Sequence, residues 1–191
     1  MTFFKENRKY IVKLILTHLA MTIFGLMVFI PFNRDDMSMK AFLVIGSAVA
    51  VILYMFLIDV DMWYLGAEDK LRVDAGRQKR NPFKGFLIGL VAEIPSFVLG
   101  ILYVGTVLFY SYYQAYPSRD FWAGSVIVTW SGTFIWNGMY LGIERICFGG
   151  NVPLFYLLIP LLPVAFSGLT YLLGLINSPF LKPPARRKKQ D

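Results

Sequence analysis

The sequence has few of the residues that build metal and redox sites. Its 191 residues include one cysteine and one histidine, Cys147 and His18. A single cysteine excludes an intramolecular disulfide, and no group of Cys and His residues has metal-site spacing. We therefore expect no bound metal and no cofactor.

Sequence motifs of enzymatic catalysis are also missing. The chain has no HExxH, no CxxC and no Gly-rich phosphate loop ahead of a helix. One His with one Glu can support acid–base chemistry, but no nucleophile or metal accompanies them. These absences favour a protein that is not an enzyme.

Apolar residues are abundant and lie in long blocks. They make up 57% of the chain, and the mean hydropathy is +0.56, whereas a soluble domain is about 45–50% apolar. Each block is long enough to cross a bilayer. The sequence therefore predicts an all-α, polytopic helical membrane bundle that forms one integral-membrane domain over residues 1–191, with spans at about 10–32, 41–58, 85–110 and 152–177.

The first block could be a signal peptide or a signal anchor. Lys5, Arg8 and Lys9 precede it, as in both kinds of segment. The apolar run is about twice the length of a signal-peptide core and has no small-residue cleavage site after it. We predict a signal anchor, which is the first transmembrane helix.

Residues 121–143 are harder to assign. They contain Trp122, Trp130 and Trp136, and tryptophan prefers the membrane interface, whereas Trp130 would lie near mid-bilayer in a simple span. Five plain spans would leave the basic tail outside. A re-entrant or interfacial segment returns the tail to the cytoplasm and satisfies the positive-inside rule better. We predict four full spans plus this segment, with both termini cytoplasmic, and keep five spans as the alternative.

The formal charge of +7 and the pI of about 9.5 reflect Lys and Arg near two membrane boundaries. These residues lie in a predicted cytoplasmic loop, 62–84, and in a basic tail, 178–191. Such clusters meet anionic lipid headgroups or a protein partner, and we expect no nucleic-acid binding. The candidate docking residues are Arg72, Arg77, Lys79, Arg80, Arg186 and Arg187.

Glu93 is the strongest candidate for a functional residue inside a span, because an ionisable group in lipid costs several kcal/mol. On a helix it shares a face with small residues such as Gly89, Ser96 and Gly100. This face predicts that Glu93 points into the bundle. Pro95 removes a backbone donor and predicts a kink nearby.

His18 lies at a similar depth in the first span, about 12 Å from its cytoplasmic end by helix rise. A hydrogen-bonded His18–Glu93 pair could relay protons or hold a cationic substrate. It could equally be a structural pair that locks two helices together. Asn137 is a further candidate for a polar contact between helices.

The run from Trp63 to Pro95, with Gly66, Asp69 and Gly76-Arg77, resembles a family of small, uncharacterised multi-pass membrane proteins from Gram-positive bacteria. The resemblance implies a bacterial plasma-membrane location. It implies no activity and no site residue.

Two functional hypotheses follow. The first is a non-enzymatic membrane component or accessory subunit that acts through the basic loop and tail. The alternative is a small transporter, or its substrate-binding subunit, with a polar site between the first and third spans that residues 121–143 close.

Overall fold

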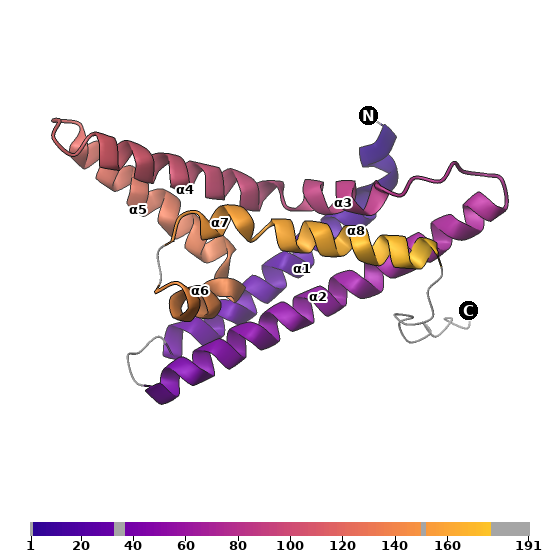
Figure 1. Cartoon of the computed structure of the whole chain (residues 1–191), viewed down its shortest axis with the longest axis horizontal. Helices are drawn as coiled ribbons and strands as arrows, with labels where there is room; N and C mark the ends of the chain where they lie inside the picture. The colour runs from indigo at the N-terminus through magenta and orange to yellow at the C-terminus, as the bar shows by residue number, and fades with distance from the viewer. Residues whose placement is uncertain (1, 33–36, 150–151, 177–191) are drawn as a thin grey trace.

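The computed structural model describes residues 2–32, 37–149 and 152–176 (Figure 1). The tail 178–191, with Arg186 and Arg187, lies outside these residues. Within them the chain is helical and has no strand, which confirms the all-α fold. The helices are α1 (Thr2–Phe32), α2 (Met37–Asp74), α3 (Lys84–Ala92), α4 (Ile94–Tyr112), α5 (Arg119–Trp136), a 3₁₀ turn η1 (Gly138–Tyr140), α6 (Leu141–Cys147), α7 (Phe155–Leu158) and α8 (Leu161–Leu175).

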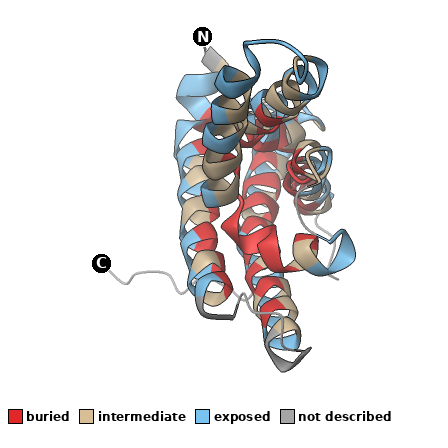
Figure 2. Cartoon of the chain, turned by 90° about the vertical axis from the view of Figure 1, so that its left-hand side faces the viewer, coloured by how far each residue is buried: buried red, intermediate tan, exposed pale blue. Residues whose placement is uncertain are grey.

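Four helical stretches are long and apolar enough to cross a membrane. They are Phe3–Ile30, Lys40–Asp74, Ile94–Tyr112 and Phe155–Leu175. Large apolar side chains on these stretches are exposed, such as Met27 and Ile30, and Figure 2 shows exposed positions along the outward faces of the helices. Apolar surface of this extent fits acyl chains and not water, so the chain is a polytopic membrane protein.

The predicted loop 62–84 is wrong in its first half, because α2 continues as a helix to Asp74. The helix persists because Met62, Leu65 and Asp69 extend the buried stripe that begins at Leu43. Only residues 75–83 form the connection, where Gly76 takes a φ of 68° that favours glycine.

The predicted third span, 85–110, consists of two helices. α3 ends at Ala92 and α4 begins at Ile94, with Glu93 between them. Pro95 stands in the first turn of α4 and cannot donate a backbone hydrogen bond into α3. Another proline, Pro160, separates α7 from α8 in the last predicted span.

Residues 121–143 form most of α5, all of η1 and the start of α6. α5 lies beside α4, where the hydroxyl groups of Thr106 and Thr129 are 2.8 Å apart. The Trp136 carbonyl oxygen lies 3.1 Å from His18 Nε2. The chain then turns, and the Gly142 N–H donates to the Ser47 hydroxyl in the first half of α2. This inward and returning path is the shape of a re-entrant segment, and its depth in a bilayer stays a prediction.

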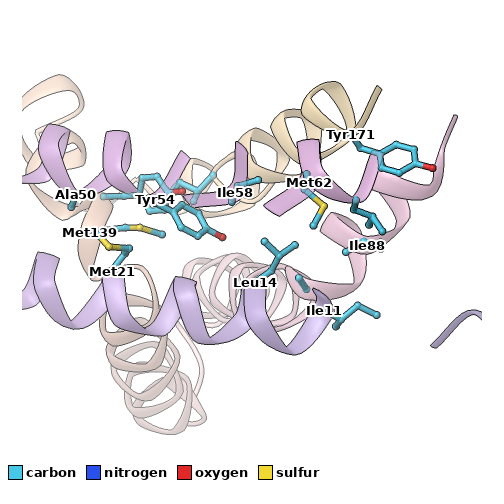
Figure 3. Close-up of a cluster of buried hydrophobic side chains, with 14 of the residues drawn as sticks. Ile11, Leu14, Met21, Ala50, Tyr54, Ile58, Met62, Ile88, Met139 and Tyr171 are labelled. Atoms are coloured by element: carbon cyan, nitrogen blue, oxygen red, sulfur yellow. The ribbon is translucent and has the colours of Figure 1, made fainter. Parts of the chain in front are cut away.

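The core lies where α1, α2, α3 and α8 meet (Figure 3). Two glycines let α2 and α8 touch backbone to backbone: a Cβ on Gly66 would lie 2.1 Å from the Tyr171 carbonyl oxygen, and one on Gly174 would lie 2.1 Å from that of Trp63. The main buried apolar side chains are Ile11, Leu14, Met21, Tyr54, Ile58, Met62, Ile88, Met139 and Tyr171.

The start of α1, the end of α2, the start of α3 and the end of α8 gather at one end of the molecule, opposite the turn between α4 and α5 (Figure 1). Lys9 and Arg77 line the same cleft, and Lys70 lines a depression with Leu175. We call this the basic end.

Candidate functional site

The break between α3 and α4 places the Glu93 side chain inside the bundle, where the residue is 2% exposed. Its backbone N–H still donates to the Gly89 carbonyl, and its own carbonyl accepts from Phe97 N–H. The backbone therefore stays hydrogen-bonded through the break while the carboxylate turns toward α1 and α2.

The Glu93 carboxylate is fully engaged by three side chains. Oε1 accepts from the Tyr54 hydroxyl at 2.7 Å and lies 3.2 Å from His18 Nδ1, and Oε2 accepts from Ser96 at 2.6 Å. Ser96 in turn accepts from Trp136 Nε1 at 2.8 Å. The structure therefore brings the predicted pair His18 and Glu93 together and adds Tyr54, Ser96 and Trp136 to it; we call these five residues the polar network.

His18 is held from its other side by the end of α5. Its Nε2 lies 3.1 Å from the Trp136 carbonyl oxygen, which also accepts from Thr22 at 2.7 Å. This carbonyl is free because α5 gives way to η1, where Tyr140 N–H bonds Asn137. Carbonyls at a helix C-terminus carry partial negative charge, which strengthens the hydrogen bond that the imidazole N–H donates.

Hydrogen-bond accounting fixes the protons of the polar network. A carbonyl only accepts, so His18 Nε2 carries a hydrogen, and the Tyr54 hydroxyl spends its hydrogen on Glu93. Nδ1 then faces two oxygens, those of Tyr54 and Glu93, so a further proton must lie between Nδ1 and Oε1. The pair is an imidazolium–carboxylate or a neutral His–GluH, and its net charge is zero in both forms.

In the described part of the structure, the Asn137 side chain makes no hydrogen bond to His18 or Glu93. Its side-chain nitrogen donates to the Thr133 carbonyl at 3.0 Å. Its Oδ1 and the nearby Tyr140 hydroxyl are buried without a hydrogen-bond partner in the described structure. Asn137 directly follows Trp136 in the sequence, and Tyr140 lies four positions after it.

Sequence reasoning missed Tyr54, Trp136 and Thr22 as members of the site. Tyr54 is the one tyrosine within the predicted second span 41–58, and a buried phenol hydroxyl usually needs a partner, so this signal was present. The Trp136 carbonyl is a backbone group and has no signature in the sequence.

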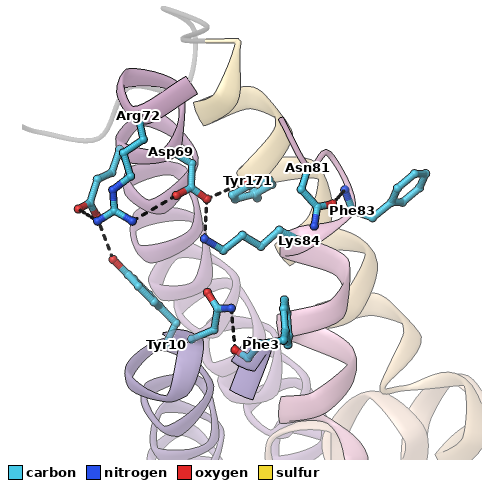
Figure 4. A network of polar contacts seen from close by, with 10 residues as sticks. Phe3, Tyr10, Asp69, Arg72, Asn81, Phe83, Lys84 and Tyr171 are labelled. Atoms are coloured by element: carbon cyan, nitrogen blue, oxygen red, sulfur yellow. Dashed lines mark hydrogen bonds and ion pairs between the residues drawn. The ribbon is translucent and has the colours of Figure 1, made fainter. Parts of the chain in front are cut away.

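A second polar cluster lies at the basic end (Figure 4). Asp69 is 1% exposed and accepts from Lys84 at 2.7 Å and from the Tyr171 hydroxyl at 2.9 Å. Arg72 bonds Glu68 at 2.7 Å. The Arg72 side chain is 50% exposed and pairs with Glu68 on its own helix, and its role in docking stays a prediction.

The other described docking candidates remain available. Arg77, Lys79 and Arg80 are exposed in the connection 75–83, and no ion pair joins them to another described residue. The described residues also contain no group of three His, Cys, Asp or Glu side chains placed to hold a metal.

A scan against protein-family models found no match, and searches of curated proteins and of solved structures found no significant similarity. The functional assignment therefore rests on the geometry of the chain itself.

Proposed function

We propose that this chain is a non-enzymatic component of a bacterial plasma membrane that binds an acidic cytoplasmic protein segment through its basic end. The observation that carries the proposal is a set of exposed cations, Arg77, Lys79 and Arg80, that form no ion pair with any residue in the described part of the chain. These side chains share one end of the molecule with the exposed Lys5 and Arg8 of α1.

The charge distribution supports both the orientation and the partner. Lys84 forms an ion pair with Asp69, and Arg72 forms one with Glu68. The exposed cations of the connection form no ion pair with another described residue. Cytoplasmic loops carry an excess of Lys and Arg, and a positive surface attracts acidic segments and raises their association rate.

Transport through the polar network is the second candidate. The observation in its favour is the pair of unpartnered buried oxygens, Asn137 Oδ1 and the Tyr140 hydroxyl, which an internal polar substrate would satisfy. We rank it second because every polar atom of the Glu93 carboxylate and the His18 ring already has a partner.

The docking proposal is tested by purifying the tagged full chain in mild detergent and identifying what accompanies it. We expect the Lys79→Glu/Arg80→Glu variant to lose about tenfold or more of the associated partner, because two attractive contacts become repulsive. The matched control is Arg119→Glu, which reverses an exposed charge at the turn between α4 and α5 and should retain the partner.

The purified partner is then titrated directly against the wild type, the Lys79→Glu/Arg80→Glu variant and the Arg119→Glu variant. Equal binding by wild type and Lys79→Glu/Arg80→Glu would refute the docking surface, as would an equal loss with Arg119→Glu. Binding that weakens with added salt is a further expected result, because exposed charges are screened.

A further inference from the structure

The basic end contains a cleft of about 600 Å³ between the first turns of α1, the last turns of α2 and the connection to α3. Leu65 and Tyr10 contribute apolar surface to it, and Leu65 is buried. Charged side chains line most of the rest, together with the neutral polar residues Asn7 and Gln78. A cleft with both kinds of lining suits a molecule with a charged group joined to an apolar body.

Most of the ionisable side chains that line the cleft already have partners. Glu68 bonds Arg72, and Lys84 bonds Asp69. The lining charges with no ion pair among the described residues are Lys9 and Arg77, which are cationic, and Glu6, which is anionic. The unpaired lining therefore carries two positive charges and one negative charge.

Lys9 and Arg77 come from different segments and line the same opening, so an anion between them would join α1 to the connection after α2. Arginine forms bidentate hydrogen bonds with phosphate, and lysine adds a point charge. A polyphosphate or a phosphate dianion would be repelled by Glu6. A phosphodiester that also carries an ammonium group satisfies all three unpaired charges.

We propose that this cleft binds the zwitterionic headgroup of a phospholipid, with the phosphodiester between Lys9 and Arg77 and the ammonium group at Glu6. The position supports a lipid, because Lys9 and Tyr10 stand where the apolar stretch of α1 begins. The inference shares the membrane orientation of the proposed function but does not depend on a protein partner.

The test uses the delipidated full chain in detergent and native mass spectrometry with dihexanoylphosphatidylethanolamine. We expect one retained molecule, and an apparent affinity that falls about tenfold or more in Arg77→Gln and in Lys9→Gln, as expected for the loss of a charge-assisted hydrogen bond. The matched control is Lys79→Gln, an exposed residue of the same connection outside the cleft, with less than about a twofold change expected for a distant surface charge.

Three further arms decide the chemistry. Glu6→Gln should weaken the ethanolamine lipid and leave dihexanoylphosphatidylglycerol unaffected. Glycerophosphoethanolamine, which has the headgroup but no acyl chains, is tested as a competitor. Weak competition assigns the site to a membrane lipid. Competition as strong as that of the lipid assigns the site to a soluble phosphodiester of the same chemistry. Competition by inorganic phosphate alone would overturn the headgroup assignment.

Absence of lipid retention by the wild type, or an equal loss with Lys79→Gln, would also overturn the proposal. Failure of the docking proposal can be told apart from failure of this one, because docking is tested with Lys79 and Arg80 and is measured by recovery of a protein partner. Size-exclusion profiles that match wild type exclude misfolding of the variants, all of which change exposed residues.

Discussion

At the scale of single residues, the polar network shows how a membrane bundle accommodates ionisable groups. His18 and Glu93 are both 2% exposed, and each is costly to bury alone. With Tyr54, Ser96 and the Trp136 carbonyl as partners, both ring nitrogens and both carboxylate oxygens are hydrogen-bonded. The pair is therefore tolerated as a neutral unit and should be sensitive to the loss of one member.

A double-mutant cycle tests this dependence. We expect His18→Ala to lower the free energy of unfolding by about 3–5 kcal/mol, because it leaves a buried carboxylate uncompensated. Glu93→Gln should cost about 1–2 kcal/mol, since an amide can still accept from Tyr54. The double variant should be no less stable than His18→Ala, which thermal melting in detergent would measure.

Additive losses would contradict a coupled pair. The same Glu93→Gln protein distinguishes the two functional candidates. The docking proposal expects undiminished partner capture, whereas transport would require lost substrate uptake by a folded protein.

The sequence identified His18 and Glu93 through their scarcity, since the one histidine and an acid within an apolar run are both conspicuous. It could not supply their surroundings. The tyrosine within the second apolar block indicated a buried hydroxyl without naming its partner, and the Trp136 carbonyl becomes available only because a helix ends there. Asn137 was a reasonable polar candidate, yet its side chain bonds its own helix at Thr133.

At the scale of elements, the sequence predicted the apolar blocks well and their ends poorly. α2 has 38 residues, or about 57 Å by helix rise, which exceeds the roughly 30 Å of a hydrocarbon core. The charges that begin at Asp59 did not end the helix, which continues to Asp74. Its buried stripe continued through Leu65 to Asp69, which requires knowledge of α8 and α3.

The contact between α2 and α8 gives a prediction at this scale. Gly66→Ala should destabilise the protein by about 1–3 kcal/mol, as overpacking does, because the new Cβ would meet the Tyr171 carbonyl oxygen. Gly124→Ala is the matched control: it lies in α5 with nothing within 4 Å of its added Cβ, so helix propensity alone should stabilise it by up to about 1 kcal/mol. Melting temperatures in detergent compare the two, and equal shifts would argue against close packing of α2 on α8.

At the scale of the whole molecule, the two ends differ in chemistry. The turn between α4 and α5 carries a stacked aromatic cluster, in which the Trp122 ring lies 4.8 Å from Phe109 and 5.9 Å from Tyr113. Aromatic residues of this kind concentrate at membrane interfaces. The basic end carries the exposed cations Arg77, Lys79 and Arg80, whereas Arg119 is the one cation at that turn among the described residues, and this difference is the polarity expected of an oriented membrane protein.

This polarity predicts which residues face the outside of the cell. In a Cys147→Ser background, Arg119→Cys should react with a membrane-impermeant maleimide on intact cells. Lys79→Cys should react only after the membrane is permeabilised, because the orientation that we propose puts the basic end in the cytoplasm. Labelling of Lys79→Cys on intact cells would reverse the orientation and with it the cytoplasmic docking proposal.

The order of the polar network along the chain has a consequence for biosynthesis. His18 precedes Tyr54 by 36 residues, Glu93 by 75 and Trp136 by 118. At about 5–20 residues per second of translation, α1 waits roughly 4–15 s for its acidic partner. The ribosome thus delivers the imidazole and the phenol first, and the carboxylate emerges when both of these hydrogen-bonding partners have already been synthesised.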